Sequence, residues 1–440
     1  MSTRQLGPGS GFPPEGTRGR GTRGHLRPFY AGLWFGGFNG VTWMIGLGTP
    51  MVLIAQQLGA NAFQIGLASS FVFLVLPLQV VATRSLARLG YKRQMVLGWG
   101  VRALFLGVPL ALALHAPAPP APWMADLFVA SVLGFCVFRA FGTAAHLPWF
   151  AAILPAEVRG RFFATDSALT SLVGVATLLS CAALFATLPG WPAFAAVYAA
   201  AMTGSALAVA SLLRLPSPPP PAAIPLRTLH LEARRLWQEP GIYKHYLALS
   251  LLAAVLTTPV GAFTAYFLRV EAGLAESHVL LLTAAQFAGQ IAAGWSIRAA
   301  IDRVPLRRMF QLATLGIACV EIFWLAYVSG SAHLVAWLPV ASFAFGAAAA
   351  ISNAAHFTML PELAGEARRP VALAVFTATH GLLAGLSPIL FGLWLKKGGA
   401  DPGLDVERFA LFFAAGALGN ALLVALFGRL RETRGGLSGT

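Results

Sequence analysis

The chain has 440 residues, of which 57% are hydrophobic and 11% are charged, and its formal net charge is +15. A soluble domain averages about 25% charged residues, so the composition excludes an ordinary soluble globular protein. The mean hydropathy of +0.71 and the uncharged runs at 169–213 and 334–360 predict a multi-pass helical membrane protein, because roughly 20 apolar residues cross a bilayer.

In chain order, residues 1–28 are rich in Gly, Arg and Pro and predict a disordered N-terminal tail. Twelve apolar runs follow, and each predicts a membrane-spanning helix. The first six lie near 29–55, 62–82, 94–114, 123–147, 165–188 and 191–213. The other six lie near 244–268, 278–300, 309–329, 334–358, 371–393 and 408–430. Pro50 and Pro259 predict kinks in the first and seventh spans.

The only long polar connection between predicted spans is the linker at 214–243. It begins with a proline run that must be extended, and residues 226–239, "LRTLHLEARRLWQE", predict a short amphipathic helix on the membrane surface. The linker divides the chain into an N-terminal six-helix bundle (29–213) and a C-terminal six-helix bundle (244–430), with a tail at 431–440.

The basic residues indicate the orientation in the membrane. If both termini are cytoplasmic, 25 of the 31 Lys and Arg residues lie on the inner side and four on the outer side, while Arg102 and Arg139 fall within spans. Excess Lys and Arg mark cytoplasmic loops, so we expect a plasma (inner) membrane protein with both termini inside. The basic residues are scattered between spans rather than gathered on one soluble face, which argues against a nucleic-acid partner.

Two distant stretches share one order of polar residues, which indicates an internal duplication. "FRAFGTAAHLPWFAAILPAEVRGRFF" (138–163) and "ISNAAHFTMLPELAGEARRPVA" (351–372) both contain Ala-Ala-His, Leu-Pro and Glu followed by two arginines. "GTP" (48–50) likewise matches "TTP" (257–259), and the offsets of such pairs fall between 206 and 215 residues. Two six-helix repeats around a central pathway are the usual construction of a secondary transporter.

Three loops resemble those of a known family. "DRVPLRR" (302–308) and "ARLGYKR" (87–93) resemble the D-R-x-G-R-R signature of the major facilitator superfamily, and "LPAEVRGR" (154–161) is similar to the loop between that family's fourth and fifth helices. The resemblance implies an all-α integral membrane fold of 12 transmembrane helices in two pseudo-symmetric bundles, which works by alternating access. It assigns a gating role to Arg88, Gly90, Lys92, Arg93, Asp302, Arg303, Arg307, Arg308, Glu157, Arg159 and Arg161. Two positions depart from the signature: Ala87 stands where the family has Asp, and Pro305 stands where it prefers Gly.

The resemblance also predicts a substrate site, because the first, fourth, seventh and tenth helices line the family's central cavity. It places Arg139 and His146 beside four further residues: Asn39, Trp43, Asn353 and His356. A guanidinium in a partly dry cavity favours a carboxylate or phosphate ligand. The alternative for Arg139 is a structural ion pair with Asp126, Asp166 or Glu321, and the alternative for the two histidines is an interfacial position near the headgroups.

Gln286 and Gln290 are four residues apart and share one face of a helix, where they would bind a hydroxylated or amide ligand or link helices. A carboxyl group shielded from water binds a proton more readily, so Glu321 and Asp166 are the predicted proton-coupling residues. Packing is the alternative for Glu321.

These observations predict secondary active transport of a small solute, with proton coupling as one option and an organic anion as the favoured substrate. The alternatives are proton-driven efflux of amphipathic compounds and a lipid scramblase or sensor that moves no solute. We expect no enzyme activity, cofactor or metal site, because the sequence contains no nucleotide-binding or metal-ligand motif. The expected partners are a small-molecule substrate, the lipid bilayer and protons, and the expected state is a monomer.

Overall fold

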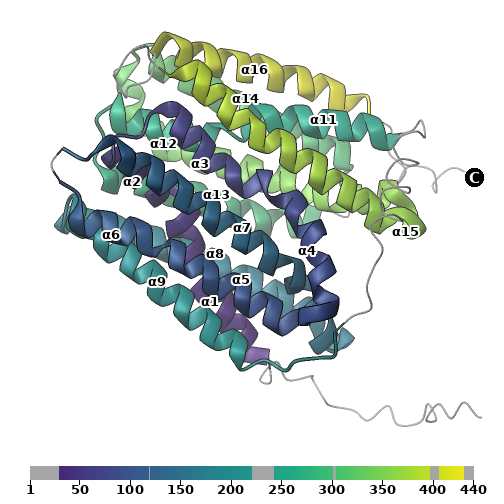
Figure 1. Ribbon diagram of the computed structural model, residues 1–440. Helices are drawn as coiled ribbons and strands as arrows, with labels where there is room; N and C mark the ends of the chain where they lie inside the picture. The colour runs from purple at the N-terminus through teal and green to yellow at the C-terminus, as the bar shows by residue number, and fades with distance from the viewer. Residues whose placement is uncertain (1–28, 118, 221–241, 301–303, 397–405, 431–440) are drawn as a thin grey trace, which may run out of the picture.

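The computed structural model describes residues 29–117, 119–220, 242–300, 304–396 and 406–430. These residues form long helices that run side by side between two ends of the molecule (Figure 1). The N-terminal half contains α1 (Tyr30–Leu47), α2 (Thr49–Gln57), α3 (Ala62–Leu74), α4 (Leu76–Leu89), α5 (Tyr91–Phe105), α6 (Gly107–His115), α7 (Pro122–Ile153), α8 (Ala156–Thr187) and α9 (Trp191–Leu213). The C-terminal half contains α11 (Ile242–Thr257), α12 (Val260–Val270), α13 (Glu276–Ala300), α14 (Leu306–Val328), the 3₁₀ helix η2 (Ala332–Trp337), α15 (Leu338–Leu395) and α16 (Val406–Gly428).

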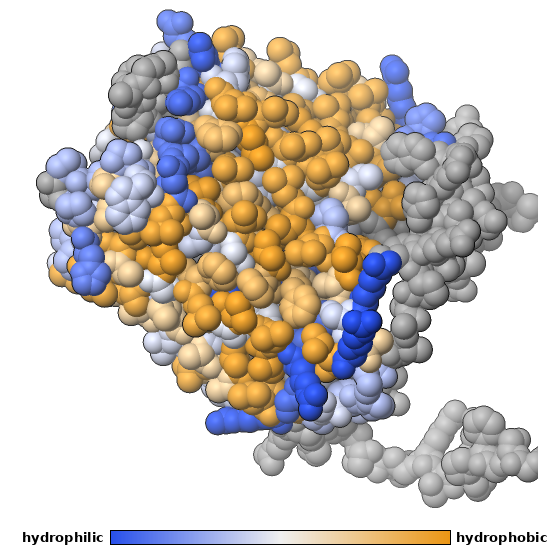
Figure 2. Space-filling model, in the orientation of Figure 1, coloured by the Kyte–Doolittle hydropathy of each residue, from blue (hydrophilic) through white to orange (hydrophobic). Residues whose placement is uncertain are grey.

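Within the described residues, 12 helical segments are long and apolar enough to cross a membrane, which confirms the predicted number. Several extend further than predicted: the second continues to Leu89 and the fourth to Ile153. The predicted amphipathic helix at 226–239 and the tails at 1–28 and 431–440 lie outside the described residues, and the domain boundaries remain a prediction. Figure 2 shows hydrophobic side chains over most of the visible side of the molecule. Large apolar residues such as Trp34, Leu104, Trp295 and Leu418 are exposed at the surface of the molecule, as expected of a surface that contacts lipid.

Four of the spans consist of two helices separated by a break. The predicted kinks at Pro50 and Pro259 are confirmed: Pro50 lies in the first turn of α2, after the extended Gly48, and Pro259 is the N-cap of α12. Proline fits a helix start because its missing N–H has no partner there in any case. The breaks at Val75 and Leu106 were not predicted.

Helix α15 has 58 residues and supplies two predicted spans. It folds back on itself, because the rings of His356 and Phe376 lie 6.1 Å apart, whereas 20 residues of straight helix would separate them by about 30 Å. The chain therefore stays helical through the turn between the tenth and eleventh spans.

The two bundles pack together differently at their two ends. At the end away from the linker, here called the distal end, one buried apolar cluster runs through residues of both halves, from Met44 and Phe128 to Phe263 and Phe409. At the linker end, each half has its own separate cluster, one around Trp149 and one around Phe310. Contacts of α3 with α15 and of α2 with α12 join the halves. The distal end is therefore the closed end.

Candidate functional site

Arg139 and Trp43 form a cation–aromatic pair in the N-terminal half. The guanidinium carbon of Arg139, on α7, lies 4.6 Å from the ring centre of Trp43, on α1. Its Nη1 donates to the carbonyl oxygen of Val72, on α3, at 3.4 Å. The pair therefore sits where three helices meet, and most of the five donors of the guanidinium remain available.

The ion-pair alternative for Arg139 does not hold in this structure. Asp126 accepts a hydrogen bond from Gln64 at 2.6 Å, Glu321 accepts one from Asn420, and the Asp166 carboxylate lies against Gly36. Among the described residues, a salt bridge joins Arg269 to Glu276, at the distal end, and does not involve Arg139. Arg139 is thus a cation that forms no ion pair with any of the described residues.

Asn39, a predicted substrate contact, is hydrogen-bonded to residues of its own bundle. Its Oδ1 accepts hydrogen bonds from Trp99 Nε1, at 3.0 Å, and from Arg102 Nη2. Arg102 is only 1% exposed and lies over the rings of Trp99 and Phe135, at 4.5 and 4.9 Å. Asn39 therefore links α1 to α5 inside the bundle. Arg102 and Arg139 lie on the neighbouring helices α5 and α7 and so bring two guanidinium groups into this bundle.

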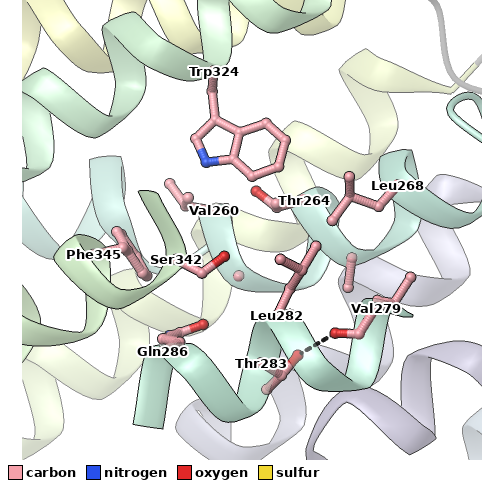
Figure 3. Close-up of a pocket in the computed structure, with 12 residues that line it drawn as sticks. Val260, Thr264, Leu268, Val279, Leu282, Thr283, Gln286, Trp324, Ser342 and Phe345 are labelled. Carbon is pink, nitrogen blue, oxygen red and sulfur yellow. Dashed lines mark hydrogen bonds between the residues drawn. The ribbon is translucent and has the colours of Figure 1, made fainter. Parts of the chain in front are cut away.

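A small cavity with a volume of about 40 Å³ lies in the C-terminal half, among α12, α13, α14 and α15 (Figure 3). Its polar lining is uncharged and comes from Thr264, Thr283, Gln286, Ser342 and the indole of Trp324. The hydroxyl of Thr264 is buried there without a hydrogen-bond partner. The predicted residue Gln286 is thus placed in a cavity, whereas Gln290, one turn further along, does not line it.

The same cavity adjoins the contact between the two halves. The hydroxyl of Thr283, on α13, shares a hydrogen bond of 2.7 Å with that of Thr49, on α2. It also donates to the carbonyl oxygen of Val279 on its own helix at 3.1 Å, the contact dashed in Figure 3. Nearby, Gly66 of α3 lies against the carbonyl oxygen of Pro388, and Gly392 lies against that of Ala62. Small residues allow helix backbones to approach this closely, so the distal closure depends on them.

The two predicted histidines have different surroundings. His146 packs against the rings of Phe35 and Phe150, with centroids at 5.8 and 4.9 Å. His356 shares a hydrogen bond of 2.6 Å, through Nδ1, with the hydroxyl of Tyr246. The ring of His380 lies 6.5 Å from that of His356. Asn353 is exposed. Sequence reasoning missed Tyr246 and His380, although the repeat offset could have drawn attention to Tyr246 opposite Phe35.

The two predicted coupling carboxylates also differ. Glu321 is 1% exposed and lies between α14 and α16, where Asn420 Nδ2 donates to its Oε2 at 2.9 Å and Gly416 leaves room for it. This arrangement supports the packing alternative. Asp166 is half-buried at the contact of α8 with α1, and α8 also contacts α13 of the other half.

Two residues of the predicted gating loops cap helices within their own bundle. Lys92 Nζ donates to the carbonyl oxygens of Leu213 and Leu215, both at 2.7 Å, at the end of α9. Arg159 Nη2 donates to Ala151 and Leu154, at 2.7 and 3.2 Å, at the end of α7. Cations at helix C-termini satisfy carbonyls that lack partners.

Most of the remaining residues with a predicted gating role lie at the surface or outside the residues that the structure describes. Gly90 adopts φ +73 between α4 and α5. The exposed residues are Arg88, Arg93, Arg161, Arg307 and Arg308. Asp302 and Arg303 lie outside the described residues, as does the side chain of Glu157, so the gating role remains a prediction.

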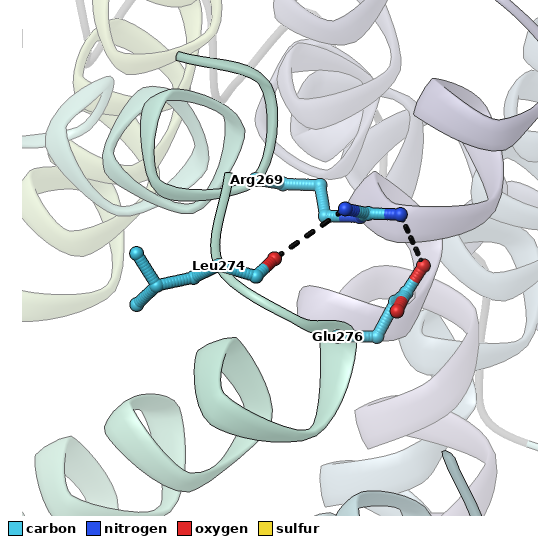
Figure 4. Close-up of polar contacts among 3 residues, drawn as sticks. All are labelled: Arg269, Leu274 and Glu276. Atoms are coloured by element: carbon cyan, nitrogen blue, oxygen red, sulfur yellow. Dashed lines mark hydrogen bonds and ion pairs between the residues drawn. The ribbon is translucent and has the colours of Figure 1, made fainter. Parts of the chain in front are cut away.

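At the distal end, an ion pair closes the turn between α12 and α13 (Figure 4). Arg269 Nη2 contacts Glu276 Oε1 at 2.6 Å, and its Nη1 donates to the carbonyl oxygen of Leu274 at 3.4 Å. Both residues belong to the C-terminal half, so this contact fixes a connection and does not join the bundles.

Comparison with solved structures identifies the architecture. A variant of the nucleoside transporter NupG matches with a TM-score of 0.68 at 15% identity, over 92% of this chain and 100% of that chain. The inward-open xylose transporter XylE from E. coli matches with a TM-score of 0.65 at 15% identity, over 93% and 96%. A POT family transporter in complex with 5-aminolevulinic acid matches with a TM-score of 0.69 at 11% identity, over 94% and 98%. The chain has the major facilitator fold.

The major facilitator fold confirms the predicted class: an all-helical, multi-pass membrane protein with 12 transmembrane-capable helices. The matched structures are transporters rather than enzymes. No family model and no curated protein matches the chain. Sequence identities of 11–15% to these structures show the major facilitator fold alone. Because one fold carries many functions, the substrate depends on the particular residues of the site.

Proposed function

We propose that this protein is a secondary transporter that moves a small organic anion across the plasma membrane by alternating access. The observation that carries the proposal is Arg139: a guanidinium that rests on the Trp43 ring, between helices of one bundle, with no carboxylate partner among the described residues. Such a group favours a carboxylate or phosphate of the substrate through charge and through paired hydrogen bonds.

The packing of the two halves supports alternating access. A single apolar cluster joins them at the distal end, whereas their clusters are separate at the linker end. With both termini in the cytoplasm, as the distribution of basic residues predicts, this arrangement corresponds to an inward-facing state. The matched structures are named as transporters of nucleosides, xylose and peptides, so the fold accommodates unrelated substrates. In this chain, the guanidinium groups of Arg102 and Arg139 favour an anion over a neutral solute.

The cavity of the C-terminal half supports a second feature of the proposed substrate. Thr264, Gln286 and Ser342 offer uncharged hydrogen-bonding groups, which suit hydroxyl or amide groups. We therefore propose a hydroxylated or amide-bearing organic anion, with the acid group at Arg139. Asp166 and Glu321 are the two carboxylate candidates for carrying a coupled proton. Asp166 is the better placed of the two, because its helix contacts both halves.

Replacing Arg139 by Gln should lower uptake of the organic anion at least about tenfold, because a hydrogen bond to a charged group contributes roughly 1.5–3 kcal/mol. Purified protein in sealed proteoliposomes would be offered radiolabelled lactate, gluconate, succinate and phosphate, with xylose and uridine as neutral solutes. Arg84→Gln is the matched control, since Arg84 is exposed on α4.

Uptake of only the neutral solutes, or anion uptake that Arg139→Gln leaves unchanged, would contradict the anion proposal. Movement of labelled lipid between leaflets without any solute uptake would favour the scramblase alternative. Transport of hydrophobic cations alone would favour efflux of amphipathic compounds.

A further inference from the structure

Two histidines and a tyrosine come together at the linker end of the C-terminal half. Tyr246 of α11 shares a 2.6 Å hydrogen bond with His356 Nδ1, and the ring of His380 lies 6.5 Å from that of His356. Both histidines belong to α15, on the two arms of its hairpin. The Nδ1 atom of His380 is buried and has no hydrogen-bond partner. A buried nitrogen without a hydrogen-bond partner is uncommon in a stable core, so the position of His380 calls for another reason than packing.

The N-terminal repeat provides an internal comparison. Residues 146 and 356 are 210 apart in the sequence, and residues 35 and 246 are 211 apart. His146 therefore corresponds to His356, and Phe35 corresponds to Tyr246. Their rings occupy equivalent contacts, since His146 packs on Phe35 at 5.8 Å and His356 packs on Tyr246 at 5.7 Å. The N-terminal copy has no hydroxyl at Phe35 and has Thr170 at the position of His380. The group formed by Tyr246, His356 and His380 thus occurs in one repeat only, which indicates a function beyond holding the helices together.

The surroundings of the two histidines contain few ionisable groups. The elements packed against them contribute the Phe310 ring from α14, at 4.7 Å from the His356 ring, and the Phe376 ring from α15 itself, at 5.1 Å from the His380 ring. Next to His380, Gly381 lies against Phe73 and Leu76 of the other half. Tyr246 is the titratable group that α11 directs at them, and the nearby Tyr243 donates to the carbonyl oxygen of Ala372. No carboxylate or guanidinium of the described residues contacts either imidazole.

We infer that His356 and His380, linked to Tyr246, form a proton-carrying site that couples the proposed transport to a proton gradient. This inference rests on the transport function proposed above and assigns the coupling to imidazoles rather than to Asp166 or Glu321. Imidazole is suited to the role because its ordinary titration lies near neutral pH.

The proton balance of this step is simple. One proton from water on one side of the membrane forms an N–H bond at an imidazole nitrogen, and that bond breaks to release the proton to water on the other side. His380 lies beside the contact of α15 with the N-terminal half at Gly381, so rocking of the bundles changes the access of water to it. A carried proton also offsets the negative charge of the anion, because a positive and a negative charge then cross together.

The test needs no known substrate, because a proton that couples to the conformational change must alter the populations of the two states. Spin labels at Arg84→Cys on α4 and Ser296→Cys on α13, both exposed near the linker end, would report the separation of the bundles in proteoliposomes. Cys319, the exposed native cysteine, would be replaced by Ala in this background. Between about pH 5 and about pH 8, we expect the population ratio of the two separations to change about tenfold, which corresponds to a tenfold difference in proton affinity.

His356→Gln and His380→Gln should each reduce that change to less than about twofold, whereas the control variant His115→Gln, at an exposed histidine that ends α6, should preserve it. Gln keeps a hydrogen-bonding side chain, and melting temperature would show that each variant is folded. If one of the two variants does not fold, the other alone still tests the inference, because the proposed site requires both imidazoles to produce the pH response. A pH response that survives both substitutions but disappears in Asp166→Asn or Glu321→Gln would overturn the inference, as would no pH response in the unmodified protein. Neither result bears on the Arg139 uptake experiment, which tests transport itself.

Discussion

Replacing Gly66 by Leu is expected to abolish transport while leaving the protein folded. Gly66, on α3, lies directly against the carbonyl oxygen of Pro388 on α15, with the Phe263 ring close by. A side chain at this position would overlap that backbone oxygen, which cannot move aside as a flexible side chain would. Overpacking of this kind costs up to about 3 kcal/mol, which corresponds to a population change of roughly 100-fold. Because the contact joins the two bundles, the cost falls on the distally closed state and not on either bundle alone.

Accessibility of Thr283→Cys would measure this effect. Thr283 is hydrogen-bonded to Thr49 in the closed distal end, so a membrane-impermeant thiol reagent should react with the cysteine slowly. In the Gly66→Leu background the same cysteine should react much faster, and uptake should be lost. Gly100→Leu is the control, since a side chain at Gly100 would meet no atom within 4 Å. Slow reaction together with normal uptake in Gly66→Leu would show that the distal contact is not required for the transport cycle.

Replacing Gly289 by Leu is expected to prevent correct folding of the C-terminal bundle. Gly289, on α13, faces the carbonyl oxygen of Phe343 and the amide nitrogen of Ala347 on α15, and Gly346 of α15 faces the carbonyl oxygen of Gln286 in return. The two helices are therefore in reciprocal backbone contact. Separating the two helices would also remove the packing of the apolar residues around the contact. We therefore expect the free energy of unfolding to fall by more than about 3 kcal/mol.

The same helix offers the control for this prediction. Gly294 is exposed, and a side chain there would meet nothing within 4 Å, so Gly294→Leu should leave stability nearly unchanged. Yield of monodisperse protein and melting temperature in detergent would compare the two variants. Equal melting temperatures would mean that α13 and α15 can move apart without loss of the fold.

The number of spans and their grouping were predictable because each rests on many residues. Twelve long apolar runs, one polar linker and the distribution of basic residues all depend on composition, which tolerates individual exceptions. The kinks at Pro50 and Pro259 were predictable because proline removes a specific backbone donor. The break at Val75 was missed although Pro77 has the same first-turn position in α4 as Pro50 has in α2, so the sequence held the same signal there. The break at Leu106 follows less directly from sequence, since Pro109 is the third residue of α6.

The side-chain partners within the membrane were less predictable. Asn39 was assigned to the substrate site from its helix alone, but its direction is set by Trp99 and Arg102 of another helix. The direction in which a helix presents each side chain depends on its rotation against its neighbours, and a helix that is apolar all round gives no periodic signal for that rotation. The same limit explains why His380 was overlooked.

The continuous apolar cluster at the distal end also concerns the membrane as an electrical insulator. An ion that entered from the linker end would meet a stretch built from groups such as Ile54, Phe263 and Phe409, each 0% exposed, and would have to shed its hydration water there at a cost of many kcal/mol. We therefore expect a protein in this state to pass no uncoupled ionic current, so that many copies of it would leave the membrane potential of a cell intact.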